Sequence, residues 1–196
     1  FMWFGTAYGL NRYDGQTFKT YYHVPGKPGT LSTSGVIALH VDHSGQLWVV
    51  THKGNFEAYH PETDTFTTYR RGAPEEEKHV MTYLAPKIYE DIRGNLWTLS
   101  TRGGLTRFNT KTKTFTHYEI EPGSPLEHLK GNVTTIYLGE NDTKNDTIWL
   151  GTNRTELAKI TFADLEKKQP AKIYTYNPPK SPPYNFAVSA IYEKHP

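Results

Sequence analysis

Three neighbouring residues, His40, Asp42 and His43, have side chains of the types that bind metal ions. Side chains along a strand point alternately to its two faces, so His40 and Asp42 would share one face while His43 falls in the following turn. Asp42 also stands three residues before Gly45, a pair typical of a tight hairpin turn. We therefore interpret Asp42 as a turn residue and predict no metal site.

Sequence signatures of a catalytic centre are absent. The chain has no cysteine, which excludes thiolate metal sites and cysteine nucleophiles. It also lacks the G-x-S-x-G, G-x-G-x-x-G and P-loop patterns. The acidic run 75–77 follows Pro74 and is typical of a solvated loop. We predict no catalytic residue and no cofactor in this chain.

Charge and composition limit the class of partner. Lys plus Arg number 22 and Asp plus Glu number 20, so the net charge of +2 gives no reason to expect a nucleic-acid partner. No apolar run approaches the roughly 18 residues of a membrane-spanning helix. Aromatic residues make up 14% of the chain, and 16 Gly and 13 Pro interrupt it, which favours many short strands joined by turns.

The tryptophans mark an internal repeat. The chain has four, at spacings of 45, 49 and 52 residues: Trp3, Trp48, Trp97 and Trp149. Each lies in a short apolar segment that ends in Thr or Ser: MWFGT (2–6), LWVVT (47–51), LWTLS (96–100) and IWLGT (148–152). Repeats of roughly 40–50 residues with several strands are typical of β-propellers.

Three further segments recur around each tryptophan. Segments rich in strand-forming residues lie at 36–42, 84–91, 133–139 and 188–194. After the tryptophan comes a second strand, at 9–13, 54–59, 103–108 and 155–160. An aromatic or apolar pair spaced by three residues completes the copy: Phe18 and Tyr21, Phe66 and Tyr69, Phe115 and Tyr118, and Ile173 and Tyr176. We expect each copy to be an antiparallel meander of strands A to D, with the tryptophan on strand B.

The turns between strands A and B support this alignment. Asp42 and Asp91 each stand six residues before a tryptophan, with a glycine three residues further on. The fourth copy has a longer loop at 139–147 in this place. A second insertion, 162–172, lengthens the next hairpin of that copy, and we expect a short helical turn there.

These strands predict an all-β chain that forms about four four-stranded antiparallel blades of a β-propeller. We expect strands B to D of a first blade, three complete blades and the first strand of another: 1–21, 36–69, 84–118, 133–176 and 186–192. The tryptophans and the aromatics of strand D would fill the layers between stacked blades. Either the last strand pairs with the first and closes a four-bladed ring, or the chain is an arc of a larger propeller. The opening FMWFGT begins in mid-motif, which favours the arc.

Binding residues are expected on the loops that join strands B and C, because function in such folds lies on loops held by a rigid scaffold. Tyr and His offer flat apolar faces with a polar tip, and Arg and Asn offer directed hydrogen-bond donors, a mixture that suits sugars. The alternative is that these are ordinary polar loop residues. The candidates are Tyr8, His52, Lys53, Arg102, Asn153 and Arg154.

The repeat resembles the two-component regulator propeller repeat. The resemblance covers nearly the whole chain and rests on the order V-x-x-I-x-x-D-x-x-G-x-L-W-x-x-T, G-L-x-R-Y/F and F-x-x-Y, best matched at 2–18 and 88–118. The second copy departs from it at Val50 and Asn55. The resemblance implies a seven-bladed propeller in the periplasmic sensor region of a hybrid two-component system. A membrane helix and a histidine kinase usually follow in such sensors, many of which respond to oligosaccharides.

Three functions stay open at this point. The resemblance favours a periplasmic ligand-sensing ectodomain of an inner-membrane sensor, with an oligosaccharide as its ligand. Its partners would be the remaining blades, the downstream sensor domains and, in a homodimer, a second copy. The alternatives are a protein–protein interaction scaffold and a propeller glycosidase or lyase, but the expected B–C loop candidates include no Asp or Glu to act as catalytic acid or base.

Overall fold

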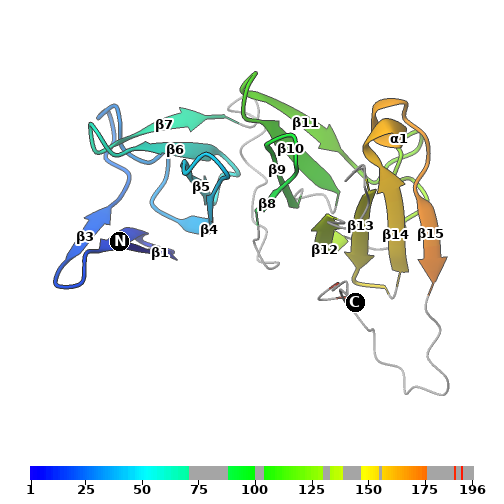
Figure 1. The fold of residues 1–196 in the computed structure, drawn as a ribbon, viewed down its shortest axis with the longest axis horizontal. Coiled ribbons are helices and arrows are strands. Elements are labelled where there is room, and N and C mark those ends of the chain that lie inside the picture. Colours follow the sequence, from blue (N-terminus) through cyan, green and yellow to red (C-terminus); the bar gives the residue numbers. More distant parts are fainter. Residues whose placement is uncertain are drawn as a thin grey trace, which may run out of the picture. The chain divides into compact units, whose positions relative to one another are not determined.

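Strands dominate the part of the chain that the computed structural model describes. The described residues are 1–70, 88–99, 104–129, 133–138, 147–154, 156–175, 188 and 191. They form four antiparallel sheets that follow one another along the chain (Figure 1). The chain divides into two compact units, 1–88 and 89–196, and each unit contains two of the sheets.

The first unit contains a three-stranded and a four-stranded sheet, each with its strands in chain order. The strands of the first sheet are β1 (Met2–Thr6), β2 (Gly9–Tyr13) and β3 (Phe18–Tyr21). Those of the second are β4 (Val36–Val41), β5 (Leu47–Thr51), β6 (Phe56–His60) and β7 (Thr65–Tyr69). Short links between consecutive strands make both sheets the predicted meanders.

The second unit contains two four-stranded meanders. The third sheet consists of β8 (Tyr89–Glu90), β9 (Asn95–Leu99), β10 (Leu105–Asn109) and β11 (Thr114–Tyr118). The fourth consists of β12 (Val133–Leu138), β13 (Thr147–Thr152), β14 (Glu156–Thr161) and β15 (Lys172–Thr175). The all-β prediction is therefore confirmed. In the expected last strand, 186–192, the structure describes only Val188 and Ile191.

Each tryptophan lies beside a tyrosine of the outermost strand of its own sheet, with ring centroids 5.8–6.0 Å apart. Trp48 and Trp97 are fully buried, whereas Trp3 and Trp149 are half-buried. The pairs are Trp3 with Tyr21, Trp48 with Tyr69, Trp97 with Tyr118 and Trp149 with Tyr174. Trp3 also contacts Tyr59 of the second sheet and Trp97 contacts Phe162 of α1, so these two tryptophans lie between neighbouring sheets, as predicted.

The fourth pair corrects one expectation. The sequence repeat assigned Ile173 and Tyr176 to the aromatic pair, but strand pairing places Tyr174 opposite Leu157. The same pairing joins Tyr21 to Leu10 in the first sheet. The insertion 162–172 changes the number of residues between the last two strands of this copy. The offsets of the other copies therefore do not show which of the neighbouring residues Ile173 and Tyr174 occupies a given position of the pair. Tyr176 itself lies outside the described residues.

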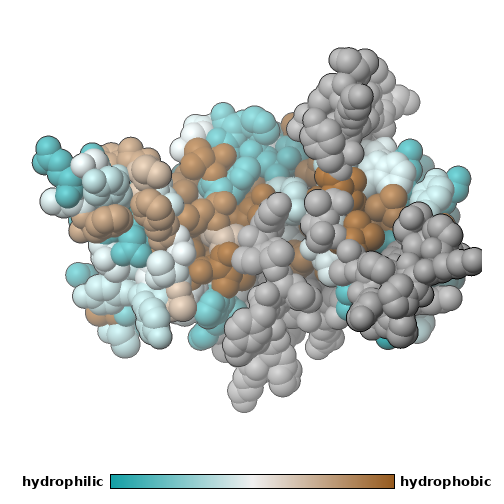
Figure 2. All heavy atoms as spheres, turned by 90° about the horizontal axis from the view of Figure 1, so that it is seen from below, coloured by the Kyte–Doolittle hydropathy of each residue, from teal (hydrophilic) through white to brown (hydrophobic). Residues whose placement is uncertain are grey.

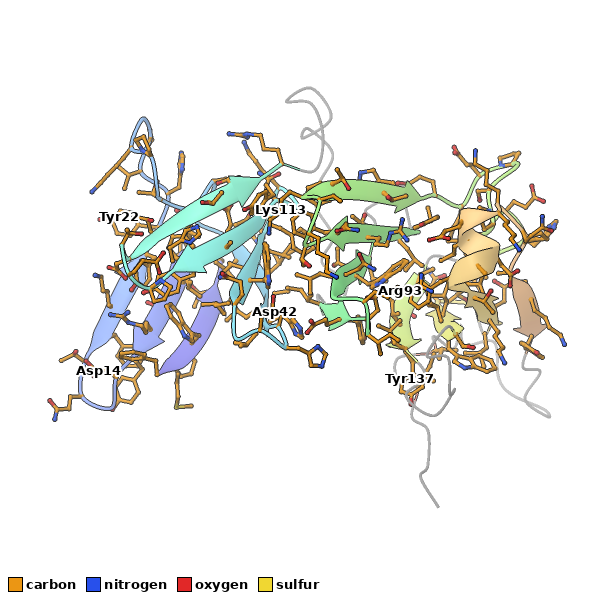
Figure 3. All side chains as sticks on the ribbon, turned by 45° about the horizontal axis from the view of Figure 1, so that its top comes forward. Asp14, Tyr22, Asp42, Arg93, Lys113 and Tyr137 are labelled. Atoms are coloured by element: carbon orange, nitrogen blue, oxygen red, sulfur yellow. The ribbon has the colours of Figure 1, made fainter. Side chains whose placement is uncertain are left out.

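In the second and third sheets, the turn between the first and second strands holds the indole group of the tryptophan. Asp42, at the turn between β4 and β5 (Figure 3), accepts a hydrogen bond of 2.7 Å from Trp48 Nε1. Its other oxygen accepts bonds from the backbone N–H groups of Ser44 and Gln46. Partial burial alone would raise the pKa of Asp42, but these hydrogen bonds outweigh it and lower the pKa. Asp91 holds Trp97 Nε1 in the same way, at 2.8 Å. The interpretation of Asp42 as a turn residue is confirmed.

The insertion in the fourth sheet forms the one helix of the described residues, α1 (Phe162–Glu166), as the sequence predicts. Thr161 caps it by accepting a hydrogen bond of 3.0 Å from the backbone N–H of Asp164. Phe162 and Leu165 are the buried residues of this helix, and their side chains pack in the core of the second unit. The described residues include no helix of the length and apolarity required to cross a membrane.

A glycine in two of the tryptophan segments makes room for a valine from the next part of the chain. A Cβ atom on Gly5 would lie 2.6 Å from Val36 Cγ1, and one on Gly151 would lie 2.5 Å from Val188 Cγ1. Both distances are too short for a real contact. Val188 also donates its backbone N–H to Thr152 O at 2.9 Å, so this residue of the expected last strand contacts the fourth sheet.

Apolar side chains reach the surface on several strands (brown in Figure 2). The first sheet exposes an apolar group on one face: Met2, Phe4 and Phe18. An exposed apolar group is suited to contact with another chain or another part of the same chain.

Candidate functional site

Five of the six predicted loop residues lie in the described part of the chain, and these five are exposed and stand at turns. Tyr8 follows β1, and His52 and Lys53 follow β5, all in the first unit. The ring of His52 lies against Gly35, where a Cβ atom would meet its Nδ1 at 2.4 Å. Asn153 and Arg154 follow β13 in the second unit, and Arg102 lies outside the described residues. That these residues share one ligand stays a prediction.

A different feature recurs in both units: an arginine on the strand that follows the tryptophan strand lies near an acid of the following sheet. In the first unit this residue is Arg12 of β2. Its guanidinium lies over the rings of Trp3 and Tyr21, at 5.8 and 5.9 Å from their centroids. It donates a hydrogen bond of 2.9 Å to Tyr59 Oη and lies 3.7 Å from Asp64 in the turn between β6 and β7.

The carboxylate of Asp64 accepts hydrogen bonds from three side chains. Its oxygens accept hydrogen bonds from Tyr21 Oη at 2.6 Å, from Tyr59 Oη at 2.8 Å and from the Lys19 ammonium. Partial burial would raise the pKa of this carboxyl, but the bonds from Lys19 and the two tyrosines outweigh it and lower the pKa to about 2. Asp64 is therefore a charged link between the first and second sheets at every physiological pH.

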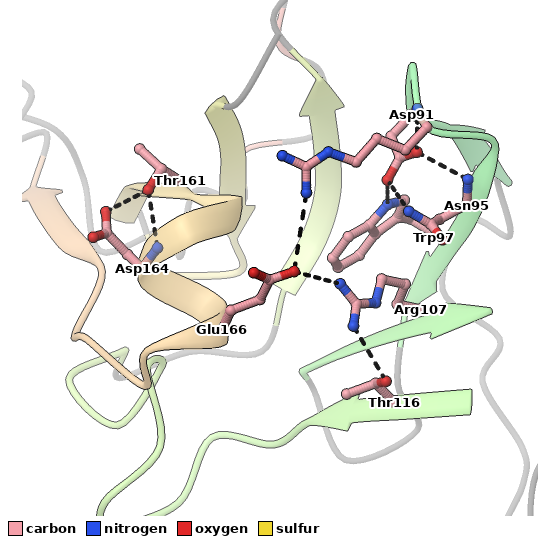
Figure 4. A network of polar contacts seen from close by, with 9 residues as sticks. Asp91, Asn95, Trp97, Arg107, Thr116, Thr161, Asp164 and Glu166 are labelled. Carbon is pink, nitrogen blue, oxygen red and sulfur yellow. Dashed lines mark hydrogen bonds and ion pairs between the residues drawn. The ribbon is translucent and has the colours of Figure 1, made fainter. Parts of the chain in front are cut away.

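The second unit repeats the arrangement with Arg107 of β10. Its guanidinium lies over Trp97 and Tyr118, at the same 5.8 and 5.9 Å from their centroids. The acid is Glu166 of α1, whose Oε1 lies 3.9 Å from Arg107 and 3.9 Å from Arg93, so that it stands between two guanidinium groups (Figure 4). The helical insertion thus provides the acidic partner for the arginine of the third sheet, as the turn residue Asp64 does for the arginine of the first.

The contacts of Arg107 are longer than those of Arg12. Its separation from Glu166 exceeds hydrogen-bond distance, and its bond to Thr116 Oγ1 is 3.5 Å long (Figure 4). Its Nε atom is buried and has no hydrogen-bond partner among the described residues. A buried donor without a partner costs free energy, so polar contacts hold this guanidinium less well than they hold that of Arg12.

A hollow of about 560 Å³ lies beside this guanidinium, within the second unit. This volume is in the range of small-molecule sites, roughly 300–1,000 Å³. Its polar lining consists of Arg107, Thr116, His117, Glu119, Glu121, Ser124, Glu166 and Lys168. Its other lining residues are Tyr118, Pro122, Gly123, Pro125 and Leu165.

The two walls of the hollow are tied together. Ala171, which follows α1, donates its backbone N–H to Pro125 O at 2.7 Å. Leu126 and Leu129 of the opposite loop are buried in the same core as Leu165. A site whose walls are held by the core needs little ordering when a ligand binds. Elsewhere, the described ranges contain no cluster of three or more His, Asp or Glu side chains that could hold a metal ion.

Sequence reasoning missed this hollow, although part of its signal was present. Arg107 occupies the arginine position of G-L-x-R-F, and the insertion 162–172 was recognised as extra chain. Neither observation shows that the insertion bends back over the neighbouring sheet. That proximity arises from tertiary packing of Phe162 and Leu165, which no local pattern records.

A scan against protein-family models and a search of curated proteins find no match to this chain. Solved structures do resemble it. The extracellular domain of the putative hybrid two-component system BT3049 from B. thetaiotaomicron matches 89% of the chain, with 21% identity and a TM-score of 0.64. PorZ, a surface component of the type-IX secretion system of Porphyromonas gingivalis, matches 88%, with 18% identity and a TM-score of 0.57. YCF48 from Cyanidioschyzon merolae matches 88%, with 13% identity and a TM-score of 0.57.

These similarities show the fold, which is that of a β-propeller-like protein. The chain spans 23% of the BT3049 domain, 25% of PorZ and 54% of YCF48. It therefore corresponds to a part of each of these larger folds.

Proposed function

We propose that the chain is a ligand-sensing part of an extracytoplasmic two-component sensor, and that its ligand is an oligosaccharide. The observation that carries the proposal is the structural likeness to the extracellular domain of a putative hybrid two-component system, over 89% of the chain at a TM-score of 0.64. The repeat supports the same reading, because the tryptophan, arginine and tyrosine positions of the propeller motif form one packed unit in the first and third sheets.

In this proposal the chain has no catalytic role and acts by binding. Ligand binding must favour one of two conformations to change a kinase, which belongs to the parent protein. The partners are the remaining propeller blades and the downstream domains of the same protein, and a second copy if the sensor is a homodimer. The proposed location is the periplasm, as the ectodomain of an inner-membrane sensor.

A second candidate function is a protein–protein interaction scaffold. The exposed apolar group of the first sheet favours it, because Met2 and Phe18 are 60% and 63% exposed. Such a surface would serve recognition of a protein rather than of a sugar. The two functions differ in which unit carries the contact, since the hollow lies in the second unit and the apolar group in the first.

The test uses membranes that contain the parent protein with this chain in place. Autophosphorylation from ATP is measured with and without a panel of oligosaccharides, and compared with a parent protein from which residues 1–196 are deleted. We expect one sugar to change the phosphorylation rate only when the chain is present. A parent protein without ATP-dependent phosphorylation, or one whose response survives the deletion, would contradict the sensing function.

A further inference from the structure

Arg12 and Arg107, which link adjacent sheets, differ in how fully the groups around them are already hydrogen-bonded. Arg12 faces an aspartate that is held by two tyrosines and a lysine, and it donates a 2.9 Å bond to one of those tyrosines. Arg107 faces a glutamate at 3.9 Å, leaves a buried Nε without a partner among the described residues and borders a hollow of about 560 Å³. The equivalent arginine is therefore fully engaged by neighbouring side chains in the first unit, whereas in the second unit it borders a hollow.

The charges around the hollow select against an acidic ligand. Three carboxylates, from Glu119, Glu121 and Glu166, line it, against the cations Arg107 and Lys168. An added carboxylate or sulfate would be repelled by the majority charge of this lining. Neutral hydroxyl groups meet no such penalty, because each hydroxyl can donate to a carboxylate and accept from a guanidinium or ammonium group.

The remaining lining suits the apolar faces of a sugar ring. Pro122 and Pro125 lie on one loop, and Leu165 lies on α1. The C–H faces of a pyranose can pack on such groups while its rim of hydroxyls reaches the polar lining. A site with alternating donors, acceptors and apolar walls therefore matches a neutral sugar more closely than a lipid, a peptide or an anion.

We propose that this hollow binds a neutral sugar ring and that the guanidinium group of Arg107, which lines it, is the anchoring donor. The inference rests on the proposed sensing function and deepens it by naming the site and the ligand class. A sugar held by Arg107 of the third sheet and by Glu121 or Lys168 would contact β10, the loop after β11 and the insertion of the fourth sheet at once. Binding would thus stabilise the third and fourth sheets against each other.

The test measures binding of named sugars to the chain by isothermal titration calorimetry. The panel is maltose, cellobiose, mannobiose, xylobiose and galactobiose, with digalacturonic acid as the acidic comparison. The variants are Glu121→Gln and Lys168→Gln, two exposed residues of the lining, with Lys167→Gln as the matched control outside it. Arg107→Ala is compared with Arg12→Ala, which removes the equivalent arginine where there is no described hollow beside it.

We expect one neutral disaccharide to bind, and digalacturonic acid to bind at least tenfold more weakly. Glu121→Gln and Lys168→Gln should each weaken binding about fivefold or more, while Lys167→Gln leaves it unchanged. Arg107→Ala should abolish binding, and Arg12→Ala should not, although both destabilise the fold.

Three results would contradict the proposal. If a neutral sugar binds with the same affinity to Glu121→Gln and Lys168→Gln, the ligand lies elsewhere and the sensing function stands. If only digalacturonic acid binds, the neutral ligand class is wrong. If none of the sugars binds, the site is wrong as a sugar site, and the phosphorylation assay decides separately whether the parent protein is a sensor.

Discussion

At the scale of single residues, Asp64 shows how a turn residue gains a structural role. Its backbone is left-handed, with φ of 57°, a conformation that aspartate tolerates better than most residues. That conformation helps to place the carboxylate where Tyr21, Tyr59 and Lys19 all donate to it. Burial and the bond to Asp64 in turn raise the pKa of Tyr21, so the tyrosine stays a donor at every pH of interest.

This network predicts a loss of stability in acid. The pKa of Asp64 is about 2 when folded and near 3.8 when unfolded, so its stabilising effect is complete above about pH 5 and is lost as the pH falls through 2. After allowance for solvent screening, we expect the loss to be about 1 kcal/mol. Urea unfolding between pH 2 and 6 measures it. In Asp64→Asn the fall over this window should be smaller by that amount.

Asp14 provides the control for this experiment. The bonds that it accepts from Thr17 and Gln16 also lower its pKa to about 2, but it is fully exposed. Its partners lie two and three residues away, and such local bonds can also form in the unfolded chain, so Asp14→Asn should change the acid profile less than Asp64→Asn does. An acid profile of Asp64→Asn equal to that of the unmodified protein would mean that the contacts between β3, β6 and Asp64 do not stabilise the protein.

At the scale of elements, the turns before the tryptophan strands β5 and β9 are held by an aspartate side chain that accepts hydrogen bonds from within the turn and from the indole. Asp91 is buried and accepts bonds from Trp97 Nε1 and from the backbone N–H groups of Arg93 and Asn95. Asp91→Ala should lower the free energy of unfolding by about 1–3 kcal/mol, because these donors lose their acceptor. In a double-mutant cycle with Trp97→Phe, we expect a coupling energy of about 0.5–3 kcal/mol. Additive effects would show that the indole bond is dispensable.

A second prediction at this scale concerns the close approach of β1 and β4. Gly5→Ala should destabilise the chain by about 1–3 kcal/mol, because its new methyl group would overlap Val36. Val36→Ala on its own should also destabilise, since Val36 is buried. The double variant should be more stable than the sum of the two losses predicts, and thermal unfolding monitored by circular dichroism measures all four proteins. Strict additivity would contradict the contact.

The elements also show which features can be read from sequence. Strands, meanders and the turn role of Asp42 follow from local patterns, and those predictions hold. The aromatic pair of the fourth sheet was misplaced because an insertion changed the offset between two strands, and Tyr174 took the place assigned to Tyr176. The hollow beside Arg107 was missed because its acidic partner comes from a helix here and from a turn in the first unit.

At the scale of the whole molecule, each unit has its own core. Leu10, Val49 and Tyr59 belong to the core of the first unit, and Leu105 and Leu150 belong to that of the second. Repeat proteins of this kind derive their stability from each sheet and from its contact with the next. Damage to one core is therefore expected to act first on its own unit.

Two matched substitutions test this expectation. Leu10 and Leu150 are both 0% exposed, so each replacement by alanine should cost about 2–5 kcal/mol. We expect Leu10→Ala to lower hydrogen-exchange protection in β2 and β5 more than in β9 and β13, and Leu150→Ala to have the opposite pattern. Mass spectrometry of peptides from these strands measures the protection of each unit, even if one unit unfolds completely. Equal loss across all four strands in both variants would show that the chain unfolds as one cooperative unit.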